Sequence, residues 1–88
     1  MAESVDEISV LVRFFAGAAA AAGVEEEKVL VPVGATVGSL VETLALRGPE
    51  LARVLAASSF LVEAVSARPE DALADGVTVD VLPPFAGG

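Results

Sequence analysis

Large apolar residues occupy every second position over residues 8–15, namely Ile8, Val10, Val12 and Phe14. Successive side chains of a β-strand point to opposite sides, so this alternation predicts a strand with one apolar face. Three later segments also predict strands: residues 28–33, 60–65 and 77–81. In the first of these, one side carries Val29, Val31 and Val33. Pro32 lacks the N–H that a strand ladder uses, which predicts an edge position for this strand.

The apolar period changes after Thr36, where every third or fourth residue is apolar: Val37, Leu40, Val41 and Leu44. This spacing predicts a helix that packs one stripe on a sheet. The Thr36 hydroxyl can accept a hydrogen bond from the first turn, and Arg47, Gly48 and Pro49 are three stop signals. Pro49 can also begin a second short helix. Its buried side is predicted to be Leu51, Val54 and Leu55.

Turn-forming segments separate these elements. The alanine-rich residues 16–23 suit either a short helical turn or a wide loop. Residues 66–75 are polar, with Leu73 as an apolar anchor, and Asp75-Gly76 predicts the turn before the last strand.

The order of the elements is two strands, a helix and then further strands. A right-handed return across one face of the sheet is the economical connection for this order. We therefore expect an α+β fold of the β-grasp (ubiquitin-like) architecture, with a mixed four- to five-stranded sheet packed on one main helix. The expected organisation is a disordered N-terminus over residues 1–7, the β-grasp domain over residues 8–82 and an extended functional C-terminal tail over residues 83–88.

The amino-acid composition limits the catalytic and metal-binding chemistry that the chain can carry out. The chain has 88 residues and contains neither cysteine nor histidine. It therefore has no thiolate nucleophile, and it lacks the usual proton shuttle and the commonest metal ligands. Carboxylates remain, but the run at residues 25–27 is typical of a solvated face. Self-contained catalysis is disfavoured, and we expect neither a bound metal nor a bound cofactor.

The net charge of the chain limits the classes of molecule that it can bind. The net charge of −8 opposes binding to nucleic acid, which depends on Lys and Arg. A protein with a basic surface is the natural complement. Residues 8–24 are apolar enough to raise the possibility of a membrane anchor or a signal peptide. Arg13 interrupts this segment, and acidic residues precede it where a signal peptide needs positive charge. We expect no membrane partner and a cytoplasmic location.

The sequence ends in Leu82-Pro83-Pro84-Phe85-Ala86-Gly87-Gly88. Two prolines end the last strand and favour extended backbone after it. Gly87 and Gly88 carry no side chain, so this backbone can enter a channel too narrow for other residues. The terminal carboxylate thus becomes a functional group that a rigid support can present.

This tail, the β-grasp order of elements and the absence of cysteine resemble the ubiquitin-like sulfur-carrier proteins (MoaD/ThiS), most of all the small subunit of molybdopterin synthase. Shorter segments carry the resemblance too: Val12-Arg13-Phe14-Phe15-Ala16, Ala35-Thr36-Val37-Gly38-Ser39-Leu40 and Leu73-Ala74-Asp75-Gly76. The diglycine is common to all sulfur carriers, whereas Pro83-Pro84 favours the molybdopterin branch.

The resemblance implies a mechanism. An E1-like enzyme uses ATP to adenylate Gly88, and a sulfur donor then replaces AMP to leave a terminal thiocarboxylate. The large subunit of molybdopterin synthase uses this sulfur on a cyclic pterin precursor, and the catalytic residues are expected there. This chain is then a non-catalytic carrier subunit. Gly88 bears the sulfur, and the residues that contact the partner channel are Gly87, Ala86, Phe85, Pro84 and Pro83.

Two departures from the family stand out. Residues 63–69 replace its usual Asn-Gly hairpin, and Val77 stands where an acidic residue is common. Both put partner choice in question more than fold. Other functions remain open: a sulfur carrier for thiamine, cysteine or tRNA thiolation, a ubiquitin-like modifier that conjugates through Gly88, or a plain interaction module.

Overall fold

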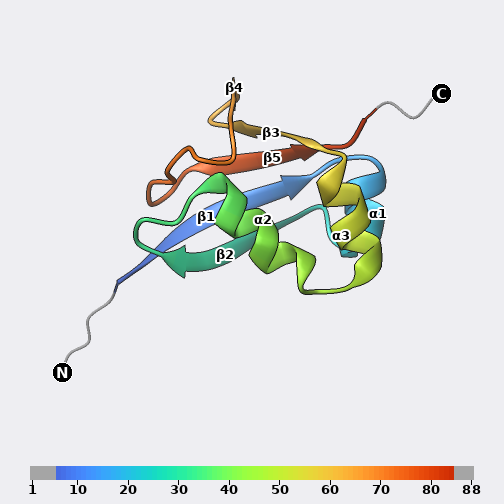
Figure 1. Cartoon of the computed structure of the whole chain (residues 1–88), viewed down its shortest axis with the longest axis horizontal. Helices are drawn as coiled ribbons and strands as arrows, with labels where there is room; N and C mark the ends of the chain where they lie inside the picture. Colours follow the sequence, from blue (N-terminus) through green and yellow to red (C-terminus); the bar gives the residue numbers. More distant parts are fainter. Residues whose placement is uncertain (1–5, 85–88) are drawn as a thin grey trace.

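The computed structural model describes residues 6–84. Its elements are, in chain order, β1 (Glu7–Phe14), α1 (Gly17–Ala22), β2 (Glu26–Pro32), α2 (Val37–Ala45), α3 (Pro49–Ala56), β3 (Ser59–Val62), β4 (Val65–Ser66) and β5 (Thr78–Leu82). The strands form one sheet in the order β2-β1-β5-β3-β4 (Figure 1). Only β1 and β5 run parallel, while the other neighbours are antiparallel. This mixed sheet confirms the predicted α+β class and β-grasp arrangement.

The inner face of the sheet, which the helices cover, is apolar. All four apolar positions of β1 are buried as the alternation predicts: Ile8, Val10, Val12 and Phe14. Val79 and Val81 of the neighbouring β5 are fully buried beside them. The edge position of β2 is also confirmed. The prediction for Val33 is wrong, since β2 ends at Pro32 and Val33 lies beyond it, 63% exposed.

Helix α2 lies across the inner face (Figure 1). Its start is a reciprocal cap: the Ser39 N–H donates to Thr36 Oγ1 at 3.2 Å, and the Thr36 N–H donates to Ser39 Oγ at 2.9 Å. The predicted cap is thus confirmed, with Ser39 as a second member that the sequence analysis missed. Leu40 and Leu44 are at most 1% exposed, so the predicted stripe packs on the sheet.

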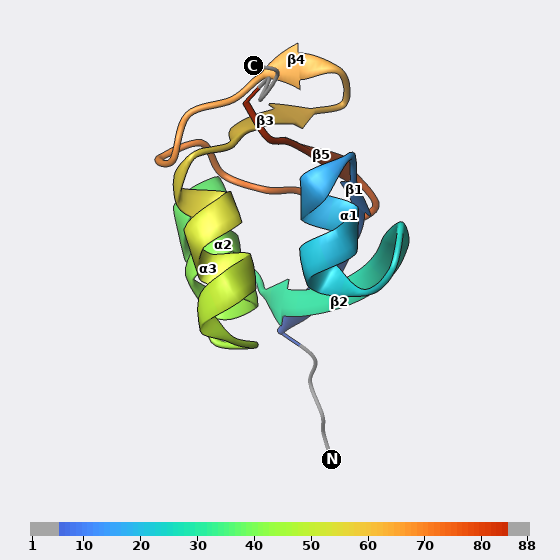
Figure 2. The same cartoon turned by 90° about the vertical axis from the view of Figure 1, so that its right-hand side faces the viewer.

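Two further helices complete this layer. The alanine-rich segment is a helix, α1, which ends at Gly23 in the left-handed region (φ 82°), where its N–H donates to the Ala19 carbonyl. Helix α3 begins at Pro49 as predicted and buries Leu51 and Leu55. Helices α1 and α3 contact each other at the end of the sheet where β1 and β5 finish (Figure 1, Figure 2). Across residues 6–84 the sheet therefore carries three helices: α2 is the predicted main helix, α3 is the predicted second short helix, and α1 decides between the helical turn and the loop that the sequence left open.

The prediction of a single strand over residues 60–65 is wrong. The segment folds as a hairpin, in which Val62 of β3 pairs with Val65 of β4. Glu63 and Ala64 form the turn with positive φ angles of 51° and 68°. The Glu63 carboxylate accepts a 2.6 Å hydrogen bond from the Thr78 N–H, and the Glu63 N–H donates to the Thr78 carbonyl. These contacts with β5 hold a turn that lacks the usual glycine.

The long loop before β5 is anchored as predicted, with Leu73 buried. Its backbone also supports α2, because the Gly38 N–H donates to the Pro69 carbonyl at 2.8 Å. The turn at Asp75-Gly76 places Gly76 at φ 87°. The Asp75 carboxylate accepts from the Ser9 N–H at 2.7 Å, so this turn is fixed to the first half of β1.

The first strand begins at Glu7, one residue before the expected boundary at Ile8. The Asp6 carbonyl accepts from the Val33 N–H at 2.9 Å, which continues the contact between the two chain segments. Residues 1–5 lie outside the described part of the chain. Across residues 6–84, α2 is the longest helix with nine residues, and none of the helices could cross a membrane.

Candidate functional site

The predicted tail follows β5, a strand that lies between two neighbours. It is paired with β1 on one side and with β3 on the other, up to the pair of Leu82 with Ser59. Pro83 and Pro84 have no N–H to donate, so the ladder cannot continue through them. Pro83 is half-buried and Pro84 is exposed. The sequence thus places the tail on firmly held backbone.

The structure covers two of the six predicted tail residues, Pro83 and Pro84. The remaining four lie outside the described residues: Phe85, Ala86, Gly87 and Gly88. Their roles as channel contacts and as the sulfur-bearing terminus stay predictions.

A groove runs beside the base of the tail, and we call it the tail-base groove. It is formed by the start of α1, the end of α3 and the two prolines, and its lining residues are Ala16, Gly17, Arg53, Val54, Ala57, Pro83 and Pro84. Six of these seven are apolar or lack a polar side chain, and Arg53 supplies the one charge. The sequence alone did not indicate this groove, because its walls come from three separate parts of the chain.

The outer face of the sheet, opposite the helices, carries an ion pair. Arg13 Nε donates to Asp80 Oδ1 at 2.8 Å, and Nη2 donates to Oδ2 at 3.2 Å. These hydrogen bonds and the charge of Asp80 raise the pKa of the Arg13 guanidinium above its ordinary value. Asp80 is only 7% exposed, although it faces away from the core. The Phe15 ring centroid lies 5.5 Å from Arg13 Cζ, within the range of a cation–π contact.

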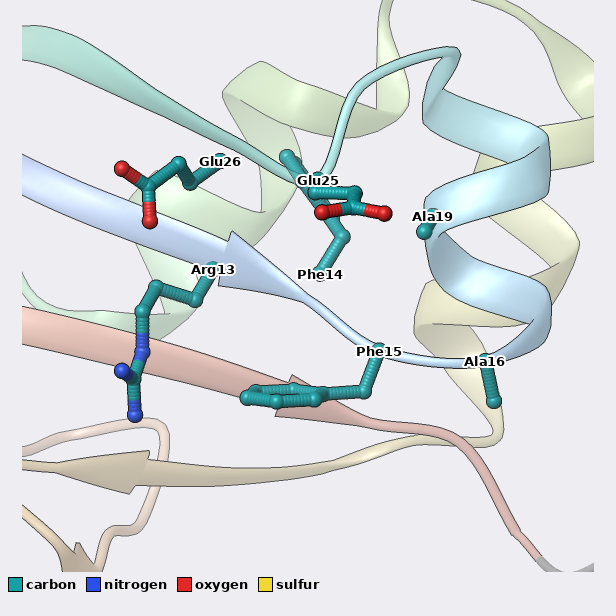
Figure 3. A pocket seen from close by; sticks show the side chains of 7 residues that line it. All are labelled: Arg13, Phe14, Phe15, Ala16, Ala19, Glu25 and Glu26. Carbon is teal, nitrogen blue, oxygen red and sulfur yellow. The ribbon is translucent and has the colours of Figure 1, made fainter.

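Figure 3 shows how alternation separates these side chains. Arg13 and Phe15 project to one side of the chain, and Phe14 between them projects to the other side. The shallow pocket around them is also lined by Glu26, the first residue of β2, and by Glu25 just before it. Within residues 6–84, no three histidine, cysteine, aspartate or glutamate side chains converge as a metal would require.

Apolar side chains surround the ion pair on the outer face. They take the alternate, outer-face positions of β2, β3, β5 and of the segment that runs from β1 to Phe15, and we call them the outer patch: Leu11, Phe15, Leu30, Leu61 and Leu82. Leu30 is 64% exposed and Phe15 38% exposed. Exposed apolar residues gathered around a satisfied charge pair are typical of a protein-binding surface.

A second ion pair lies at the edge of the inner face. Arg47, just after α2, donates to both carboxylate oxygens of Glu27 on β2 at 2.6 Å. This contact lowers the pKa of Glu27 and raises that of Arg47. From the sequence, Arg47 was predicted only as a stop signal of the helix. The pair of Arg13 with Asp80 could have been predicted only once β1 and β5 were known to be neighbours, and the pair of Arg47 with Glu27 only once the end of α2 was known to lie beside β2.

These features define a class: a small ubiquitin-like β-grasp protein whose sheet supports a C-terminal extension. The ThiS family model matches residues 12–88, and the chain belongs to this family. No curated protein sequence matches the chain.

Solved structures agree with this class. SAMP1 from Haloferax volcanii is 30% identical, with a TM-score of 0.80 over 91% of this chain and 99% of that one. A Pyrococcus furiosus protein, solved as a candidate molybdopterin converting factor subunit 1, is 29% identical with a TM-score of 0.81, over 89% of this chain and 99% of that one. Subunits 1 and 2 of the molybdopterin-converting factor from Helicobacter pylori were solved as a protein–protein complex. The matching chain shares the fold: it is 22% identical, with a TM-score of 0.62 over 92% of this chain and all of that one.

Proposed function

We propose that this protein is the sulfur-carrier subunit of a molybdopterin synthase, with Gly88 as the residue that bears the sulfur. The observation that carries the proposal is the Gly87-Gly88 sequence of a ThiS-family chain, which follows in sequence after Pro83-Pro84 and the strand β5, itself paired on both sides. The preceding Pro83-Pro84 pair favours the molybdopterin branch, as does the similarity to the Pyrococcus furiosus protein.

The chemistry follows from the terminal group. A free α-carboxylate has a pKa of about 3.3 to 3.7, so Gly88 is an anion at neutral pH and a poor electrophile. An E1-like partner transfers AMP from ATP to this carboxylate and releases pyrophosphate. A sulfur donor then displaces AMP, and the terminus becomes a thiocarboxylate. Glycines at the last two positions let this group reach a reacting centre inside the partner.

The outer patch is the docking surface for the large subunit in this proposal. Its leucines supply apolar contact area, and the acidic residues around it meet basic residues of the partner. The Helicobacter pylori neighbour, solved as a complex of two subunits, supports a partner of this kind. We propose that the complex acts in the cytoplasm, where disulfide bonds are rare and a chain without cysteine is at no disadvantage.

Deletion of Gly88 tests the proposal. The deletion moves the carboxylate by about 3.3 to 3.6 Å of extended chain. A misplacement of about 1 Å can already cost about 100-fold in rate, so thiocarboxylate formation should fall by at least that factor. Loading is measured as the mass gained when sulfur replaces one oxygen, after incubation with activating enzyme, ATP and a sulfur source. Conversion of the pterin precursor by the large subunit is measured next.

A matched control adds one alanine to the N-terminus, and its counterpart adds one alanine after Gly88. Both have the same composition, but only the second displaces the terminal carboxylate and puts a Cβ into the channel. We expect normal loading for the first variant and none for the second. Loading and turnover near the wild-type rate for the C-terminal variant would exclude the sulfur-carrier function.

A second candidate function is a ubiquitin-like modifier, favoured by the similarity to SAMP1 from Haloferax volcanii, a small archaeal modifier protein. In this case the activated Gly88 forms an amide with a lysine of another protein. The same loading reaction separates the two functions. A modifier gives conjugates that grow by the mass of this chain, whereas a molybdopterin carrier gives precursor conversion with the large subunit.

A further inference from the structure

The tail-base groove is an apolar hollow whose walls are already fixed by the fold. Helices α1 and α3 contact each other beside it, and small side chains such as Ala16 and Ala57 leave its surface recessed. Pro84, the last residue that the structure describes, is itself part of the lining. The chain therefore continues from the rim of the groove.

We propose that the tail-base groove is a docking site for the chain's own C-terminal segment. Phe85 occupies the apolar hollow, and the terminal carboxylate of Gly88 pairs with Arg53. Phe85 is the one bulky side chain among the last four residues, and it follows the groove wall directly. The three small residues after it have no bulk to keep the terminus away from α3.

Charge favours this occupant. The chain has five basic residues. Three of the arginines already pair with carboxylates: Arg13, Arg47 and Arg68. Arg53 has no such partner within residues 6–84 and lines the groove, so its guanidinium can take the terminal carboxylate. Four extended residues span about 13 Å, enough to cross from Pro84 to the neighbouring helix.

The tail is covalently attached beside the groove, so even weak contacts between them can hold the tail in place. A group tethered by a short linker has an effective concentration in the millimolar range, so modest affinity populates the docked state. The tail then exchanges between a docked and an extended form. This consequence rests on the proposed function: only the extended form can enter an activating enzyme, so docking lowers the apparent affinity by the extended fraction.

The variant Phe85→Trp tests docking directly, because the chain has no other tryptophan and no tyrosine. The measurement is acrylamide quenching of its fluorescence, compared with the free peptide of the same last seven residues. If half of the molecules are docked, the quenching constant falls about twofold, and the emission shifts to shorter wavelength. Equal quenching of protein and peptide would overturn the proposal.

A matched pair of substitutions assigns the site. Ala57→Glu fills the groove and repels the carboxylate, whereas Ala56→Glu places the same charge one residue away, outside the lining. Both positions are exposed, so both variants should fold, which circular dichroism checks. Quenching should rise to the peptide value only with Ala57→Glu. Arg53→Gln should raise it in part, and Arg68→Gln should leave it unchanged.

A second measurement keeps the natural Phe85. The methyl NMR signals of Val54 and Ala57 are compared between the full chain and a chain that ends at Pro84. Docking predicts shifts at these two methyl groups and none at Val65 on the far edge of the sheet. Signals that are identical in both chains, and that move only when the large subunit is added, would assign the groove to the partner and overturn the proposal. Neither measurement uses ATP or enzyme, so a failure of sulfur loading leaves both results interpretable.

Discussion

The two faces of the sheet use different chemistry. The inner face is apolar, mostly Val and Leu, and the helices α1, α2 and α3 cover it (Figure 2). The outer face carries leucines, an aromatic ring and the Arg13–Asp80 pair, without any covering layer in residues 6–84. Burial on the inner face supplies stability, whereas the outer face keeps apolar groups near water, where they can bind a partner. The difference separates residues that hold the fold from residues that are free to serve function.

Leu40→Ala should give the largest change in stability. Leu40, on the side of α2 that packs on the sheet, is 1% exposed, so the substitution leaves a cavity that costs about 2 to 5 kcal/mol of unfolding free energy. Denaturant unfolding measures this loss. The matched control is Leu46→Ala at the end of the same helix, where Leu46 is 86% exposed and the change should stay below about 0.5 kcal/mol. A loss of that small size for Leu40→Ala would contradict the inner-face assignment.

Arg13→Ala should have the next largest effect. It leaves the carboxylate of Asp80, only 7% exposed, without the guanidinium that satisfies both of its oxygens. We expect a loss smaller than that of Leu40→Ala but larger than that of Arg68→Ala, whose side chain is 74% exposed. Thermal unfolding of the three variants gives the ranking. If Arg13→Ala matches Arg68→Ala, the outer ion pair serves binding alone.

Glu27→Gln should have a smaller effect that depends on pH. Its pKa is lowered in the folded state by the hydrogen bonds from Arg47. The stability from this shift is therefore present above the unfolded pKa of about 4.3 and is lost as pH falls through the folded pKa. The pair is partly exposed, so the difference at pH 7 should stay below about 1 kcal/mol. The stabilities of wild type and variant should converge as pH falls below the lowered folded pKa of Glu27, and a constant difference would contradict the linkage.

Leu30→Ser should leave stability nearly unchanged and weaken association instead. Leu30 is 64% exposed at the edge of the outer patch, so folding gains little from it. If it is an interface anchor, its loss costs about tenfold or more in affinity for the large subunit. Leu46→Ser is the control on the helix side, where binding should not change. Equal effects of the two variants would remove the functional distinction between the faces.

Salt should affect the same association mainly through its rate of formation. The net charge of −8 attracts a basic partner over distance, and added salt screens this attraction. Stopped-flow mixing with the large subunit should show slower association at higher salt, with little change in dissociation. An association rate independent of salt would assign the charge to solubility alone.

The sequence by itself determined the elements whose signals are local. Alternation in residues 8–15, the stripe and cap of α2, the Pro49 helix start and the Leu73 anchor all depend on residues close together in the chain, and the structure confirms them. The β-grasp architecture was predicted from the order of these elements along the chain. The Gly87-Gly88 terminus was also readable directly, as a covalent feature of the chain.

Tertiary structure decided what depends on distant partners. Glu63 and Ala64 form a turn because β5 binds their backbone and carboxylate, and nothing in an apolar run announces that contact. Arg13 and Asp80 are 67 positions apart and meet only because β1 and β5 are parallel neighbours. The tail-base groove likewise needs α1, α3 and the end of β5 in one place. Local periodicity specifies which side of an element is apolar, but the packing of whole elements decides which residues face one another.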